Sequence, residues 1–111
     1  MDEIYRICQF AMDCIVHGSY KLLNDCNALA RVSESDIKRV LAEYNPGKSP
    51  VMPPDSYFKE SAYIIEYRDG SGYHVDINLW YPSGESDLTL QLDIRKRQGR
   101  LSFIIDDIHV L

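Results

Sequence analysis

Leu88-Thr89-Leu90-Gln91-Leu92-Asp93-Ile94 decides the fold of this 111-residue chain, because apolar and polar residues alternate along it without a break. Tyr73-His74-Val75-Asp76-Ile77-Asn78-Leu79 repeats the alternation. A period of two places every second side chain on the same face of a strand. The two stretches therefore predict an antiparallel sheet with one buried face and one face open to water or to a partner.

Two further segments complete the predicted sheet, residues 62–68 before these stretches and the final segment from Leu101 to Val110. Turn-forming residues separate them, such as Asp69-Gly70-Ser71-Gly72. In the final segment the apolar parity changes after Ile105, which predicts a β-bulge at Asp106-Asp107. The sequence thus predicts four consecutive antiparallel strands.

The first half of the chain is predicted to be helical. Residues 3–16 have apolar residues at helical spacing and end at Gly18, a residue typical of helix C-caps. A second helix is expected from Ser19, with an apolar stripe of Leu22, Leu23, Cys26 and Leu29. A third begins at Ser33-Glu34-Ser35-Asp36, where Asp36 replaces the usual Glu of a capping box. We predict a single α+β domain, residues 1–111, with N-terminal helices packed on a curved four-stranded antiparallel sheet.

Composition limits the function classes. Twelve basic and seventeen acidic residues give a net charge of −5, which disfavours direct nucleic-acid binding and suits a basic protein partner. The acidic start of the chain does not resemble a signal peptide, and no apolar run approaches the roughly 20 residues that cross a bilayer. The three cysteines fit a reducing cytoplasm as small buried residues. The histidines are dispersed, so neither a metal nor another cofactor is predicted.

The free face of the predicted sheet is polar and acidic. It is expected to carry Glu66, His74, Asp76, Asn78, Thr89, Gln91 and Asp93. Tyrosine and tryptophan are common at protein interfaces, and the chain has eight tyrosines and one tryptophan. From exposure and charge, the predicted partner-binding residues are Glu66, Asp76, Trp80, Glu85, Asp87 and Asp93.

An alternative places chemistry at the bulge. If one aspartate of the Asp106-Asp107 pair turned inward beneath the helices, burial would raise its pKa towards that of a general base. With His109 it would line the mouth of a pocket between the helices and the sheet. His74 and Asp76 share a face and form another acid–base candidate, for which an ordinary exposed polar pair is the simpler interpretation. Because bulky residues fill the inward positions, no catalytic residue is predicted and the chain is not expected to be an enzyme.

Three stretches carry a family resemblance: Leu79-Trp80-Tyr81, Gly84-Glu85-Ser86-Asp87-Leu88-Thr89-Leu90 and Ile105-Asp106-Asp107-Ile108-His109-Val110-Leu111. Together with the helices-first order, they resemble small bacterial domains of the cone-shaped, cystatin-like, nuclear-transport-factor-two-like (SnoaL-like) superfamily. The size and acidity also resemble the immunity proteins of contact-dependent growth inhibition and other polymorphic toxin systems. The resemblance implies a cytoplasmic binding module that occludes a toxin, for example a basic nuclease, and it allows a homodimer through the sheet face. It equally includes small-molecule-binding domains and isomerase- or dehydratase-like enzymes, which form the alternative.

Overall fold

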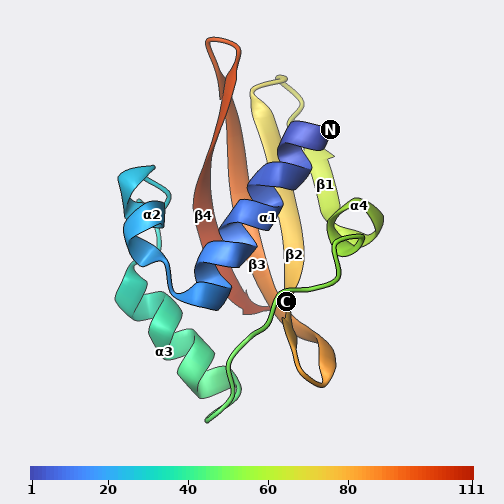
Figure 1. Ribbon diagram of the computed structural model, residues 1–111. Helices are drawn as coiled ribbons and strands as arrows, with labels where there is room; N and C mark the ends of the chain where they lie inside the picture. Colours follow the sequence, from blue (N-terminus) through green and yellow to red (C-terminus); the bar gives the residue numbers. More distant parts are fainter.

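A computed structural model describes residues 1–111 and confirms the α+β class. Four helices precede four strands along the chain (Figure 1). The helices are α1 (Asp2–His17), α2 (Tyr20–Asp25), α3 (Glu34–Tyr44) and α4 (Tyr57–Ser61). The strands are β1 (Tyr63–Glu66), β2 (Gly72–Tyr81), β3 (Gly84–Arg97) and β4 (Arg100–Val110).

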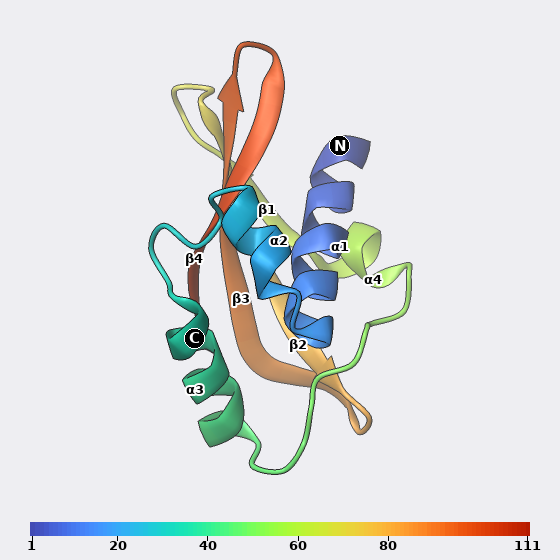
Figure 2. The same ribbon diagram turned by 60° about the vertical axis from the view of Figure 1, so that its left-hand side comes forward.

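The strands form one antiparallel sheet in the order β1-β2-β3-β4, so each strand pairs with its neighbour in the chain. Helix α1 crosses one face of this sheet diagonally, and α4 lies beside β1 (Figure 1). Figure 2 shows the sheet curving around α1, with no helix lying across the opposite face. We call the face that α1 covers the inner face and the opposite one the outer face.

The predicted bulge in β4 is confirmed. Gln91 of β3 pairs with Asp107, whereas the next residue, Leu92, pairs with Ile105, so Asp106 is the extra residue. The bulge keeps both Ile105 and Ile108 buried on the inner face, although three positions separate them. It thus explains the change in apolar parity that the sequence shows.

The helix ends follow local signals with one exception. Gly18 ends α1 in the left-handed conformation (φ 66°), and Ser33 and Asp36 form the predicted capping box at the start of α3. The prediction for the second helix was wrong in length, because α2 ends at Asp25. Leu22 is 50% exposed, so the expected apolar stripe does not continue along α2.

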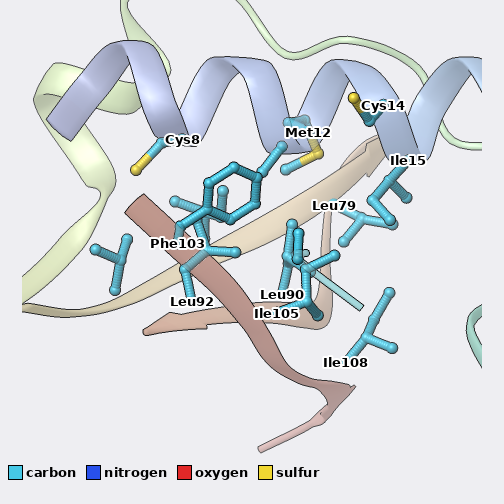
Figure 3. Close-up of a cluster of buried hydrophobic side chains, with 14 of the residues drawn as sticks. Cys8, Met12, Cys14, Ile15, Leu79, Leu90, Leu92, Phe103, Ile105 and Ile108 are labelled. Atoms are coloured by element: carbon cyan, nitrogen blue, oxygen red, sulfur yellow. The ribbon is translucent and has the colours of Figure 1, made fainter. Parts of the chain in front are cut away.

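Apolar side chains fill the space between α1 and the sheet. Twenty-four buried hydrophobic residues form one cluster, to which α1 contributes Ile4, Cys8, Ala11, Met12, Cys14 and Ile15. Figure 3 shows Met12 and Phe103 among Leu79, Leu90, Leu92 and Ile105, which come from three different strands. The helices are therefore held to the sheet mainly by burial of apolar surface.

Backbone groups at both edges of the sheet find partners outside it. On the β2 side, where β1 does not reach, Val51 N donates to Trp80 O and Asn78 N donates to the Tyr57 hydroxyl, at 2.8 and 2.7 Å. On the β4 side, Ile105 N donates to Ala28 O at 2.9 Å. The loops that cover the edges thereby limit unwanted strand pairing. No helix in the structure has the length and apolar character required to pass through a membrane.

Candidate functional site

The outer face of the sheet is the largest surface that the fold leaves without a helix (Figure 2). Strand pairing arranges the side chains on this face in rows across the strands. Asp76, Gln91 and Asp107 form one row, and His74 and Asp93 stand in the row beside it. The edge strand β1 adds Tyr63 opposite Asp76 and Ile65 opposite His74. These two apolar side chains are 56% and 45% exposed.

Hydrogen bonds connect the polar side chains across the strands. Asp76 Oδ1 lies 2.7 Å from His74 Nε2 and accepts a hydrogen bond from Gln91 Nε2 at 2.9 Å. Asn78 accepts from the Thr89 hydroxyl at 2.8 Å and donates to Glu85 at 3.0 Å. Because each bond joins different positions of the sheet, the polar surface is fixed before any ligand arrives.

Asp93 is the centre of a second polar cluster and is only 2% exposed. Its Oδ1 accepts hydrogen bonds from the Tyr67 hydroxyl at 2.8 Å and from Arg95 Nε at 2.9 Å. Its Oδ2 lies 3.0 Å from Arg31 Nη1, and the same nitrogen donates to Asp106 Oδ1 at 2.7 Å. Arg31 comes from the loop between α2 and α3, so this ion pair ties the helical half of the chain to the sheet.

The environment of Asp93 keeps its carboxylate charged. Burial by itself raises the pKa of Asp93, but the hydrogen bonds from Arg95 and Tyr67, the attraction of Arg95 and the contact with Arg31 outweigh burial. The pKa of Asp93 is therefore lowered below its ordinary value. A buried carboxylate with a lowered pKa is a poor general base, and Asp93 acts as a fixed acceptor for the surrounding cations.

The predicted partner-binding residues do not all lie on the outer face. The predicted position of Glu66 on the free face was wrong, because Glu66 pairs with Tyr73 on the inner side of the sheet edge. Glu66 also accepts a hydrogen bond from Lys96. Asp93 and Thr89 are on the outer face, but the expectation that they are exposed was wrong, since both are buried. Arg31, Tyr67 and Arg95 enclose the side chain of Asp93.

Of the other predicted residues, Trp80, Glu85 and Asp87 lie near the β2–β3 hairpin, and Asp76 lies in the middle of β2. Glu85 is exposed, and Asp76 is half-buried. Trp80 packs edge-to-face on Tyr57, with 5.6 Å between ring centroids, so it is only partly available to a partner. Asp87 is exposed and accepts a hydrogen bond from the Tyr44 hydroxyl, which directs it towards α3.

The expectation that an aspartate at the bulge turns inward was also wrong. The side chain of Asp106 is 40% exposed and that of Asp107 is 54% exposed. Asp107 Oδ2 lies 2.9 Å from His109 Nδ1, although the two groups are not aligned for a hydrogen bond. None of the five principal surface depressions is lined by Asp106, Asp107 or His109. Neither aspartate is therefore buried beneath the helices, as the catalytic alternative required.

Charge is distributed unevenly along the outer face. Asp76, Glu85 and Asp107 make no ion pair with Lys or Arg. Glu85 lies beside the β2–β3 hairpin, and Asp76 and Asp107 lie on either side of Gln91, closer to that hairpin than Arg95. We call these three carboxylates the acidic row. At the other end of the strands lie Arg95 and the β1–β2 turn that carries Arg68. The face is therefore acidic at one end and basic at the other, where the sequence had predicted an acidic surface throughout.

Sequence reasoning missed Tyr63, Ile65, Tyr67 and Arg31. The first three follow from the register of β1, because Tyr63 pairs with the outer-face residue Asp76. A correct parity for residues 63–67 would have identified them. No sequence signal identifies Arg31, because its partner Asp93 is 62 positions away and two helices and two strands lie between them in the chain. No group of three or more His, Cys, Asp or Glu side chains is arranged to hold a metal ion.

Comparison with known proteins identifies one family. A model of the family described as "Domain of unknown function (DUF7668)" matches residues 12–111, which is nearly the whole chain. No curated protein and no solved structure matches it. The resemblance to SnoaL-like domains and to immunity proteins therefore stays a prediction. The matched residues include the last part of α1 from Met12, the outer face and every strand, and the chain belongs to the DUF7668 family of domains of unknown function.

Proposed function

We propose that this chain is a protein-binding module that uses the acidic end of its outer face to bind a basic partner protein. The observation that supports the proposal is the acidic row. Its three carboxylates have no Lys or Arg partner within the chain and stand on a surface without helices. A positively charged partner would be attracted to this end and would complete the missing ion pairs.

The exposed apolar residues beside the acidic row would contribute affinity by becoming buried against the partner. Tyr63 stands opposite Asp76, and Ile65 is two residues further along the same edge strand. Interfaces draw most of their affinity from a few buried anchors, while surrounding charges mainly accelerate association. The pairing of one exposed aromatic residue with neighbouring carboxylates fits that division of roles.

The specific form of the proposal is an immunity protein that acts in the cytoplasm and occludes a cognate bacterial toxin. The resemblance stated from the sequence supports it, as do the net charge of −5 and the small size of the chain. A basic nuclease is a suitable toxin, because a surface that binds phosphates would also bind the acidic row. The filled interior supports binding over catalysis as the role of this domain.

The test compares two charge variants in affinity capture from the source cells. The first carries Asp76→Asn, Glu85→Gln and Asp107→Asn. The control carries Glu3→Gln, Asp55→Asn and Glu60→Gln, which remove the same charge from exposed positions on or beside α1 and α4. The proposal expects a stoichiometric basic partner that the control retains and the acidic-row variant loses. Equal capture by both variants would contradict it.

Kinetics and growth then test the proposed roles. With the purified partner, loss of the acidic row should slow association by about tenfold at low salt, and added salt should reduce the difference. Tyr63→Ala should mainly accelerate dissociation. The partner expressed alone should arrest growth, and co-expression of the wild-type chain should restore it. A partner that is not toxic would refute the immunity form of the proposal but not the binding module. Self-association of the purified chain through this face would contradict a separate basic partner and would instead identify a second copy of the chain as the partner.

A further inference from the structure

A depression at the basic end of the outer face lies beyond the surface assigned to the protein partner. It is lined by Tyr67, Arg68, Asp69, Ser71 and Arg95, which come from the β1–β2 turn and from the adjoining end of β3. No residue of the acidic row and neither of its apolar neighbours, Tyr63 and Ile65, lines it.

The wall formed by the β1–β2 turn is rigid. Tyr67 N donates to Gly72 O, Gly70 N donates to Tyr67 O, and Ser71 N donates to Asp69 Oδ1, all at 2.9–3.0 Å. The turn is also pressed against β3, because a Cβ placed on Gly72 would lie 1.9 Å from the carbonyl oxygen of Ile94. The lining residues are thus held in place without a ligand.

Arg95 is held in a fixed orientation at this depression. Its Nε donates to the buried Asp93, and its guanidinium carbon lies 5.1 Å from the centre of the Tyr67 ring. Tyr67 is itself fixed, because its hydroxyl donates to the same oxygen of Asp93. The two terminal nitrogens of Arg95 donate no hydrogen bond within the chain. They present four N–H donors as a preorganised fork.

The charges around the fork favour an anion. Arg68 makes no ion pair in the structure and adds a second guanidinium. The charge of Asp93 is shared between Arg95 and Arg31, so it does not cancel both lining arginines. Asp69 is the one carboxylate in the lining, and its Oδ1 is turned towards Ser71 N. Two arginines thus face the depression against one carboxylate that is engaged with its own turn.

We propose that this depression binds an oxyanion group, a carboxylate or a phosphate, through paired hydrogen bonds from the terminal nitrogens of Arg95, with Arg68 as the second cation. The planar guanidinium matches two oxygens of either group. Both groups carry the charge and the paired acceptors that the fork requires. A free carboxylate or phosphate ion and the same group attached to a larger molecule would accept the same hydrogen bonds from Arg95.

Titration of the whole chain with inorganic phosphate and, separately, with acetate tests the proposal, with amide and arginine side-chain N–H resonances as the readout and chloride keeping ionic strength constant. We expect the chemical shifts of Arg68, Ser71 and Arg95 to change and to reach a plateau as the anion concentration rises. The dissociation constants of phosphate and acetate are then compared, and the lower value identifies which of the two groups the depression prefers.

Two variants and one control make the test specific. Arg95→Lys keeps the charge but removes the fork, and it should weaken binding by about tenfold. Arg68→Gln should weaken binding by about threefold without touching Asp93. Arg100→Gln removes an exposed cation outside the depression and should leave binding unchanged. Linear shifts with both anions, or equal affinities in all three variants, would overturn the proposal.

Discussion

Replacement of Asp93 by Asn should cost far more stability than the same change at Asp106. Both carboxylates contact the Arg31 guanidinium, at 3.0 and 2.7 Å. They differ in burial, because the side chain of Asp93 is 3% exposed and that of Asp106 is 40% exposed. Asp93 also accepts hydrogen bonds from Tyr67 and Arg95, so the comparison measures burial together with these two additional contacts.

The magnitude follows from the contacts that remain after substitution. Breaking a fully buried ion pair costs about 3–5 kcal/mol. Here Arg31 and Arg95 are each more than 40% exposed, so water compensates part of the loss. We expect Asp93→Asn to lower the free energy of unfolding by about 2–3 kcal/mol, since charged hydrogen bonds contribute about 1.5–3 kcal/mol each. Asp106→Asn should cost less than about 1 kcal/mol.

Urea denaturation followed by circular dichroism measures both values. A loss of 2–3 kcal/mol corresponds to a decrease in melting temperature of roughly 8–12 °C for a domain of this size. Because the pKa of Asp93 is lowered in the folded state, its charge stabilises the fold above the ordinary value of 3.8, and this contribution decreases as the pH falls below 3.8. The difference between wild type and Asp93→Asn should therefore shrink towards pH 3. Equal losses at both positions, or a difference that does not change with pH, would refute the reasoning.

Three further predictions concern the turn, the thiols and a helix cap. Gly72→Ala should destabilise the fold by more than about 3 kcal/mol in urea denaturation, because its Cβ would collide with the backbone of Ile94; a loss below 1 kcal/mol would contradict the register. Burial raises the pKa of the Cys8 thiol to about 12, so at pH 8 a disulfide reagent should modify the exposed Cys26 in the native chain and Cys8 only after denaturation. Ser33→Ala should cost about 1 kcal/mol in thermal unfolding by removing the capping box, and rescue by Ser33→Asp would distinguish lost capping from general disruption.

The sequence was sufficient to predict those structural features that depend only on residues close together in the chain. The alternation from Leu88 to Ile94 produced a strand with buried even positions, and the change of parity at Asp106 produced the bulge. Gly18 and the capping box at Ser33 set the helix ends where they were expected. These features depend on neighbours within a few residues, which is why they could be read from the sequence.

The candidate site depended on distances that no local pattern encodes. Asp93 alternates like an exposed residue, yet Arg31, Tyr67 and Arg95 from three separate segments enclose it. Glu66 is charged, as expected for a residue on the free face, but the register of β1 places it opposite Tyr73 on the inner side. The length of α2 likewise depended on packing rather than on its apolar spacing.

The sequence by itself therefore determined the order of the elements, the inward face of each long strand and the overall acidity. The tertiary structure alone decided which carboxylates are neutralised, because an ion pair forms only where the folded chain brings an arginine within about 4 Å. That selection leaves the acidic row at one end of the outer face and the Arg95 fork at the other. The sequence alone cannot distinguish these two ends, because acidic and basic residues of the outer face are interspersed along the chain. They are separated only in the folded structure.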